Sequence, residues 1–288
     1  MTQQQAVAED VRECCFRITA SFEGRELPGG FGNLTGNFDG QGLSWGFLQF
    51  AMKAGSLPEI WRACLARDRK RCSEVLGDLY EPWKTVLRLP GEEQVEWAIH
   101  ICEKPRSRKI REAWNSRLRE LGLAFGDVQR EFADRRLNLA ALYCDRFKLT
   151  TDRSLAGFFD LVVQQGSLFP QAKKLQVEAK IQEVTTEVTK RTGGNLTEAD
   201  RLEIPLRARA LTAAAAWVDD CLSRRMTIIH GTGKVHGKVY NLGQEYGLLG
   251  KPWRATGPQS ASPGSAGASP ADPLPTTPGL GQLPDWWV

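Results

Sequence analysis

Apolar residues recur every three or four positions along most of the first 253 residues, and this spacing predicts a mainly helical protein. The first such stretch places Val11, Cys15, Ile18 and Phe22 on one face and ends directly before Glu23. Further helical patterns cover residues 59–66, 92–102, 106–121, 128–147, 155–165, 171–192 and 198–224. Four alanines at 213–216, inside the last pattern, predict a helix that packs closely against a neighbour.

Three segments depart from this pattern. Residues 29–46 contain seven glycines in eighteen positions with aromatics between them, which predicts turns with short strands or an irregular hairpin. Residues 235–247 are interrupted by glycine and tyrosine and predict a loop. From residue 254 the chain is rich in Pro, Gly, Ser and Ala, which predicts a folded domain over 1–253 and a disordered tail over 254–288. The Trp286-Trp287 pair near its end suits either a docking peptide or a disordered terminus.

Composition narrows the class of protein. The 288 residues are 41% hydrophobic and 25% charged, which is typical of a soluble globular protein and excludes collagen-like and coiled-coil chains. The net charge of +4 permits an anionic polymer as partner without requiring one. The seven cysteines form no Cys-x-x-Cys pair, so we expect buried, reduced thiols and no metal site or cofactor. No apolar run has the length of a membrane span, and the first ten residues do not resemble a secretory signal, so we expect synthesis in the cytoplasm.

Two carboxylates have settings that suit acid–base chemistry. Glu23 follows Phe22 at the end of an amphipathic helix, where desolvation and the helix dipole are expected to raise the pKa of its carboxyl. Asp39 lies in a Gly-rich turn, where a carboxylate tends to stay ionised. An acid and a base in such different settings are what glycoside hydrolysis requires. An Asp-Gly turn also forms without any catalytic role, so these two residues alone leave both interpretations open.

A resemblance to a known family favours the catalytic interpretation. The order of helix, Ser-Phe-Glu, Gly-rich segment and Asp39-Gly-Gln-Gly-Leu-Ser-Trp-Gly-Phe-Leu-Gln-Phe50 resembles the chitosanases of glycoside hydrolase family 46, within the lysozyme superfamily. A second stretch, Leu155–Gly166, is similar to the helix that in this family ends in Asp-x-x-x-Gln-His-Gly. The resemblance implies a mainly α, two-lobed lysozyme-superfamily fold with a small Gly-rich β-hairpin beside a glycan cleft.

The resemblance also implies roles for individual residues. Glu23 corresponds to the general acid, Asp39 to the general base, and Ser44 to a hydroxyl that positions the attacking water. Asp160 corresponds to a buried acid in a charge network that reaches the catalytic acid through arginines, for which Arg207 or Arg209 is expected here. A structural ion pair between helices is the competing interpretation for Asp160, and in this fold both interpretations can hold. An inverting mechanism predicts carboxyl groups about 6.5–9.5 Å apart.

Departures from the family pattern concern the substrate. Gln41 replaces an arginine, and the acidic residue that binds a glucosamine ammonium aligns near Gly55-Ser56, where no carboxylate exists; the alternative is that another acid, such as Glu59, takes its place. Most of the nine tryptophans are expected to pack in the core, and Trp45, beside the site, is the one that could stack on a sugar ring instead. Chitosan is a polycation, whereas peptidoglycan carries carboxylates, so a basic chain without this acid favours a lysozyme-like hydrolase of peptidoglycan glycan strands. A chitosanase, or a non-catalytic glycan-binding protein of the same fold, is the alternative.

Delivery and partners follow from that interpretation. A wall hydrolase without a secretory signal would act as an antibacterial effector or a phage-type lysin. It would reach the bacterial wall by injection or lysis, and its partners would be an immunity protein or a delivery component. The stretch 104–119 holds seven basic residues and one acidic residue. It suits a solvated helix face or contact with an anionic wall polymer, and no nucleic-acid-binding motif accompanies it.

Overall fold

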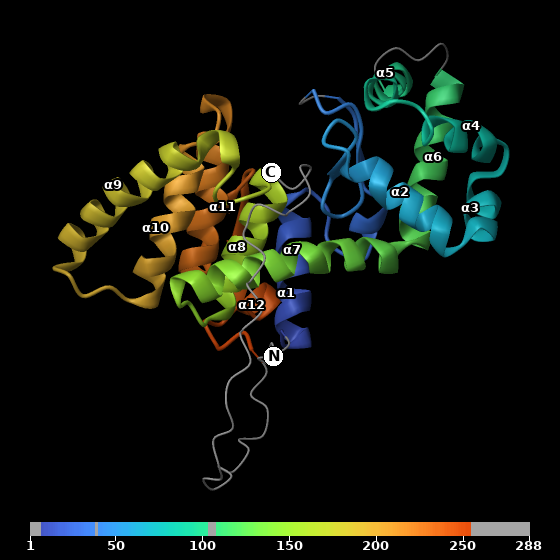
Figure 1. The fold of residues 1–288 in the computed structure, drawn as a ribbon. Coiled ribbons are helices and arrows are strands. Elements are labelled where there is room, and N and C mark those ends of the chain that lie inside the picture. The colour runs from blue at the N-terminus through green and yellow to red at the C-terminus, as the bar shows by residue number, and fades with distance from the viewer. Residues whose placement is uncertain (1–6, 38–39, 103–107, 255–288) are drawn as a thin grey trace, which may run out of the picture.

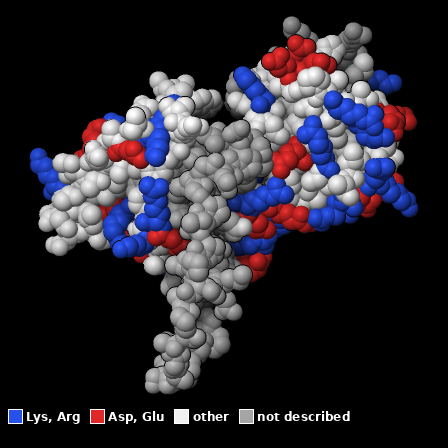
Figure 2. All heavy atoms as spheres, viewed as in Figure 1, with Lys and Arg blue, Asp and Glu red and all other residues white. Residues whose placement is uncertain are grey.

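The computed structural model describes residues 7–37, 40–102 and 108–254, which form two largely helical lobes (Figure 1; the same view with all heavy atoms as spheres in Figure 2). The α-helices are α1 Glu9–Phe22, α2 Ser56–Arg67, α3 Arg69–Leu76, α4 Tyr80–Val86, α5 Gly91–Cys102, α6 Arg108–Ala124, α7 Gly126–Phe147, α8 Asp152–Gln165, α9 Lys174–Thr192, α10 Glu198–Leu211, α11 Val218–His230 and α12 Leu242–Tyr246. Short 3-10 helices are η1 Gly29–Gly32, η2 Gly77–Leu79, η3 Gln171–Lys173 and η4 Ala215–Trp217. The predicted fold class is therefore confirmed. The predicted tail, 254–288, lies outside the described residues except for its first residue.

Two small antiparallel sheets accompany the helices. The strands β1 Leu34–Thr35, β2 Ser44–Trp45 and β3 Phe50–Ala51 pair in chain order, and Ser44 lies opposite both Thr35 and Ala51. This sheet confirms the irregular hairpin predicted from the glycine-rich segment. The strands β4 Thr232–Val235 and β5 Lys238–Asn241 form a second hairpin. The loop predicted over 235–247 is wrong, because the segment contains β5 and α12, each too short to give a periodic sequence pattern.

Helix α7 extends across both lobes (Figure 1). It contacts α2 in the lobe built from α2–α6 and the three-stranded sheet, and α8 in the lobe built from α8–α11. Its 22 residues correspond to a length of roughly 33 Å at 1.5 Å per residue. Helix α1 packs against α8, so the residue that follows α1 lies where the two lobes meet.

Tryptophans form the core of the first lobe. The Trp61 ring lies 6.3, 6.0 and 6.2 Å from the rings of Trp45, Trp83 and Trp97, and Trp114 lies 5.1 Å from Trp97. Trp45 is fully buried, and its Nε1 donates a hydrogen bond of 2.7 Å to the Leu118 carbonyl. The prediction that Trp45 stacks on a sugar ring is therefore wrong, because its indole is enclosed by the packing of this lobe.

A buried glutamine connects the glycine-rich segment to α7. The Oε1 atom of Gln129 accepts a bond of 3.1 Å from the Phe47 amide, and its Nε2 donates to the carbonyls of Phe31 and Gly122. Gly46 lies so close that a Cβ atom there would meet Gln129 Oε1 at 2.3 Å. These contacts fix the sheet, and with it one wall of the cleft, relative to α7.

The helix predicted over 198–224 is broken in the structure. Helix α10 ends at Leu211 and α11 begins at Val218, and Ala214, Ala215 and Ala216 are exposed in the connection. The expectation of close packing at these alanines is therefore wrong, because methyl groups bury too little apolar surface to hold this segment against a neighbour. Helices α3 and α4 were not predicted; α3 buries only Cys72 and Leu76 in an otherwise charged sequence. No described helix is long and apolar enough to cross a bilayer.

Candidate active site

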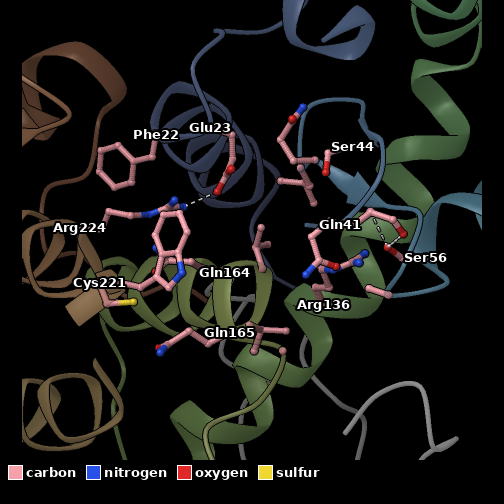
Figure 3. A pocket seen from close by; sticks show the side chains of 18 of the residues that line it. Phe22, Glu23, Gln41, Ser44, Ser56, Arg136, Gln164, Gln165, Cys221 and Arg224 are labelled. Atoms are coloured by element: carbon pink, nitrogen blue, oxygen red, sulfur yellow. Dashed lines mark hydrogen bonds and ion pairs between the residues drawn. The ribbon is translucent and has the colours of Figure 1, made fainter. Parts of the chain in front are cut away.

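A cleft of about 840 Å³ lies where the end of α1, the three-stranded sheet, α7, α8 and the start of α11 meet (Figure 3). The described residues on its walls include four of the residues predicted from the sequence for the site and its substrate contacts, namely Glu23, Gln41, Ser44 and Ser56. Arg209 also reaches its wall. Residues separated by more than 180 positions in the sequence therefore line one cavity.

Glu23 is held at the end of α1 with its carboxyl in the cleft (Figure 3). It caps the helix through its backbone, and the Asn33 side chain donates a bond of 3.2 Å to its carbonyl oxygen. Its Oε1 lies 2.8 Å from Nη2 of Arg224, and its side chain is 19% exposed. The carboxyl is thus accessible from the cleft while one oxygen is fixed by a buried guanidinium.

Arg224 belongs to a buried ionic cluster on α8 and α11. Its Nη2 lies 2.5 Å from Oδ1 of Asp160, and Arg225 forms a second ion pair with the same carboxylate. Both arginines and Asp160 are almost completely buried. Burial acts to raise the pKa of Asp160, but the two guanidinium charges outweigh it and hold this pKa below its usual value. Asp160 is therefore an ionised anchor beneath the cleft.

The cluster continues to the surface through hydrogen bonds. Arg225 donates a bond of 2.9 Å to Oε1 of Gln164, and Gln164 donates through its Nε2 to Asp220 over 2.5 Å. The other Asp220 oxygen lies 2.5 Å from Nε2 of His236, which is at the turn between β4 and β5. A continuous set of polar contacts thus extends from Glu23 to the exposed hairpin.

The arginines predicted to contact Asp160 lie elsewhere. Arg207 forms ion pairs with Glu187 on α9 and with Glu203 on its own helix, α10. Arg209 donates to the carbonyls of Ser167 and Gln165, which follow or end α8. The prediction is wrong because the chain turns back after α10, so that α11 rather than α10 places its arginines beside Asp160. Two adjacent arginines before an apolar run, Arg224-Arg225-Met-Thr-Ile-Ile, were the sequence signal that could have identified them.

The wall opposite Glu23 is built from the three-stranded sheet and α2 (Figure 3). Ser44 lies on β2 and faces the cleft across from Glu23 (Figure 3). Ser56 begins α2, and its Oγ accepts a bond of 3.0 Å from the Ala51 amide, which ties the helix to β3. Asp39, the predicted base, lies outside the described residues, so the predicted distance between its carboxyl and that of Glu23 stays a prediction.

Two further cleft residues were not predicted from the sequence. Trp217 ends η4 on the cleft wall, and its 47% exposure makes its indole accessible to a ligand. Arg136, on α7, also lines the cleft and lies on the side of Gln41 and Ser56 (Figure 3). Neither residue belongs to a motif. In the sequence alone, each looks like an ordinary surface residue of a helix.

Comparisons with known proteins identify the fold. No protein-family model matches the chain, and no curated protein sequence matches it. Among solved structures, the GH46 chitosanase of Gynuella sunshinyii in complex with chitotetraose is similar with a TM-score of 0.57 at 15% identity. That alignment covers 82% of this chain and 98% of the chitosanase. The native chitosanase of Bacillus subtilis MY002 gives a TM-score of 0.52 at 16% identity, covering 82% and 98% of the two chains.

The chain therefore has the fold of the GH46 chitosanases, which confirms the fold that the sequence resemblance implied. The match extends over most of this chain and nearly all of each neighbour, so both lobes are included.

Proposed function

We propose that the protein is an inverting glycoside hydrolase that cleaves β-1,4 bonds in an amino-sugar polysaccharide. The observation that carries the proposal is the Glu23 carboxyl, which lies in the cleft between the lobes and is fixed at 2.8 Å by Arg224. Arg224 is in turn anchored at the buried Asp160. The fold shared with GH46 chitosanases supports the same assignment.

In this mechanism Glu23 gives its proton to the glycosidic oxygen as the bond from that oxygen to the anomeric carbon breaks. Asp39 takes a proton from a water molecule that attacks the anomeric carbon from the opposite face, and Ser44 positions that water. Water adds across the bond, and the product has the inverted anomeric configuration. Arg224 holds Glu23 in one orientation, so that little motion is needed for the proton transfer.

Chitosan is the substrate that the comparisons support better, because the structural neighbours are chitosanases and one of them holds chitotetraose. Peptidoglycan glycan strands are the second candidate. The observation in their favour is the excess of basic over acidic side chains among the described residues of the cleft. Basic walls repel a polycation and attract a glycan that carries carboxylates.

The decisive test replaces the acid. Purified wild-type protein and Glu23→Gln are incubated with chitosan and with peptidoglycan sacculi, and released reducing ends and turbidity are measured. We expect Glu23→Gln to lower the rate by about 10²–10⁴-fold, the usual contribution of a general acid. Glu26→Gln is the matched control, because Glu26 pairs with Lys238 outside the cleft and should keep the wild-type rate.

The outcomes separate the alternatives. Proton NMR of the first product formed should give the inverted anomer, and a retained anomer contradicts the roles of Glu23 and Asp39. Equal rates for wild type and Glu23→Gln on both polymers contradict the enzyme assignment. Binding of either polymer without hydrolysis indicates a non-catalytic glycan-binding protein.

A role as an antibacterial effector or phage-type lysin is a further part of the proposal for peptidoglycan. It predicts that cells directed to export the chain to their periplasm lyse, and that cells producing it in their cytoplasm do not. Glu23→Gln should remove the lysis. Lysis that persists in this variant contradicts the role, because it does not then depend on the proposed acid.

A further inference from the structure

Arg136 is a cleft arginine without a carboxylate partner among the described residues. It lies on α7 and lines the cleft (Figure 3). Its Nη1 donates a long hydrogen bond of 3.3 Å to the Phe132 carbonyl, and its guanidinium lies 4.8 Å from the centre of the Phe50 ring. A guanidinium has five N–H donors, so one bond and one stacking contact leave donors for a ligand in the cleft.

The charges nearest to Arg136 are already matched with each other. Arg135 lies 2.8 Å from Glu59, and both belong to the same wall of the cleft. Burial lowers the pKa of Arg136 to about 10, and the attraction of Glu59 opposes this effect only in part. Arg136 therefore stays charged at neutral pH, and Arg135, Glu59 and Arg136 together carry a net charge of +1 among the described residues of this wall.

The other cleft arginines are occupied. Arg224 contacts Glu23 and Asp160, whereas Arg209 donates to backbone carbonyls and to the Thr212 hydroxyl. Arg136 differs from them because, among the described residues, most of its N–H donors have no partner.

The described carboxylates of the cleft are all engaged by nitrogen atoms of the protein. These carboxylates are Glu23, Glu59 and Asp220, and their partners are Arg224, Arg135 and His236. An ammonium group of a cationic glycan would have to compete with these contacts. A carboxylate of an anionic glycan would instead find Arg136 without a competing anion among the described residues of the cleft.

We propose that Arg136 binds a carboxylate carried by a sugar of the glycan, so that the cleft takes an acidic amino-sugar polysaccharide. This inference rests on the proposed function, because it assumes that the cleft binds a glycan. The guanidinium fork matches a carboxylate in a planar, two-bond geometry. Two kinds of sugar could provide this carboxylate: a muramic acid, through its lactyl ether, and a uronic acid, through its C6 carboxyl.

Binding is measured so that it does not depend on turnover. Full-length Glu23→Gln protein is titrated calorimetrically with four tetrasaccharides. They are an N-acetylglucosamine–N-acetylmuramic acid tetrasaccharide without peptides, its carboxyl-reduced form, a glucuronic acid–N-acetylglucosamine tetrasaccharide, and chitotetraose. We expect at least one carboxylated sugar to bind about tenfold to a hundredfold tighter than the carboxyl-reduced form, as one charge-assisted pair provides. The preferred carboxylated sugar identifies the source.

The role of Arg136 is tested in the same background. Arg136→Gln should remove the tenfold to hundredfold preference for the carboxylated sugar and leave the affinity for the reduced form unchanged. Arg136→Lys keeps the charge without the fork and should retain part of the preference. Arg146→Gln is the matched control, because Arg146 lies on the same helix and also stacks on a phenylalanine, Phe169, but outside the cleft.

Each outcome decides the inference. A preference that Arg136→Gln removes, with unchanged thermal midpoint, supports it. Tighter binding of chitotetraose than of every carboxylated sugar overturns it, as does an equal loss for the carboxylated and reduced forms. If the preference holds but wild-type protein hydrolyses none of these glycans, the proposed hydrolase function fails and the carboxylate site stands.

Discussion

Arg224 lies 2.8 Å from Glu23, and the same guanidinium nitrogen lies 2.5 Å from the buried Asp160. The proposed acid is therefore positioned by the core of the second lobe rather than by its own helix alone. Because Asp160 and Arg225 are fully buried, Arg224 has little freedom to move. The Glu23 carboxyl that it contacts is therefore restricted to a narrow range of orientations. Changes beneath the cleft should consequently alter catalysis.

Arg224→Lys tests this coupling. A lysine keeps the charge but cannot contact Glu23 and Asp160 together in the fork geometry of arginine. We expect kcat to fall about tenfold to a hundredfold, since small displacements of a catalytic group have effects of this size, with KM nearly unchanged. Steady-state kinetics on the preferred glycan provide the measurement.

Arg207→Lys is the matched control for this variant. Arg207 pairs with Glu187 of α9 and does not line the cleft, so its substitution should leave kcat as in the wild type. Equal kcat in Arg224→Lys and wild type contradicts the positioning role.

Acid should unfold the protein partly through Asp160. Because the two arginines hold the pKa of Asp160 below the 3.8 of an unperturbed aspartate, the unfolded chain binds a proton at higher pH than the folded chain does. The stabilisation is fully present above pH 3.8 and is lost as the pH falls through the lowered pKa of the folded state. Urea unfolding at pH 6, 4 and 3 should show this fall.

Asp160→Asn provides the comparison for that experiment. The variant leaves two buried guanidiniums without a carboxylate, which should cost about 3–5 kcal/mol at neutral pH. Its stability should also vary less than that of the wild type between pH 4 and pH 3. A variant with wild-type stability and an equally steep acid response would show that Asp160 is not the anchor.

The sequence was sufficient for the helices that bury a regular apolar face. Helix α1 buries Val11, Cys15, Ile18 and Phe22 as predicted, and the resemblance around Glu23 led to the correct fold. Elements with short or charged sequences, such as α3 and β5, were missed because their stability comes from tertiary contacts rather than from periodicity.

The site could be predicted only where it follows a motif. Glu23, Gln41, Ser44 and Ser56 lie in or near the quoted stretch and meet in the cleft. The partners of Asp160 could not be assigned, because the choice between α10 and α11 depends on where the chain turns. Arg136 and Trp217 become visible only once exposure and neighbouring charges are known.

Trp217→Ala should weaken glycan binding. An indole that is 47% exposed on the cleft wall offers a flat apolar surface to a sugar ring. We expect KM to rise about threefold to tenfold, which corresponds to a stacking contribution of roughly 0.5–1.5 kcal/mol, with little change in the thermal midpoint. Trp217→Phe should keep most of the affinity.

Trp45→Phe is the contrasting variant. It removes the buried hydrogen bond to Leu118 and should lower the thermal midpoint without raising KM. The stacking role of Trp217 is excluded if KM for the glycan is the same in wild type and Trp217→Ala.

Gln129→Met should loosen the cleft wall. The substitution keeps the side-chain size but leaves the Phe47 amide and the carbonyls of Phe31 and Gly122 without this partner. Unsatisfied buried polar groups cost about 1–3 kcal/mol each, so the free energy of unfolding should fall by at least that amount. Chemical denaturation gives the value, and Gln244→Met, at an exposed position, should show no change. Equal unfolding free energies in both variants would exclude the role of Gln129.

Helix α7 carries both Gln129 and Arg136 and crosses from one lobe to the other without a proline, and after its first residue without a glycine. A continuous helix of this kind holds the two walls of the cleft at a fixed distance. We therefore expect the width of the cleft to be the same before and after a ligand binds, so that a sugar must fit that width. Selection among glycans would then depend on their thickness and charge, and little on how far the protein closes around them.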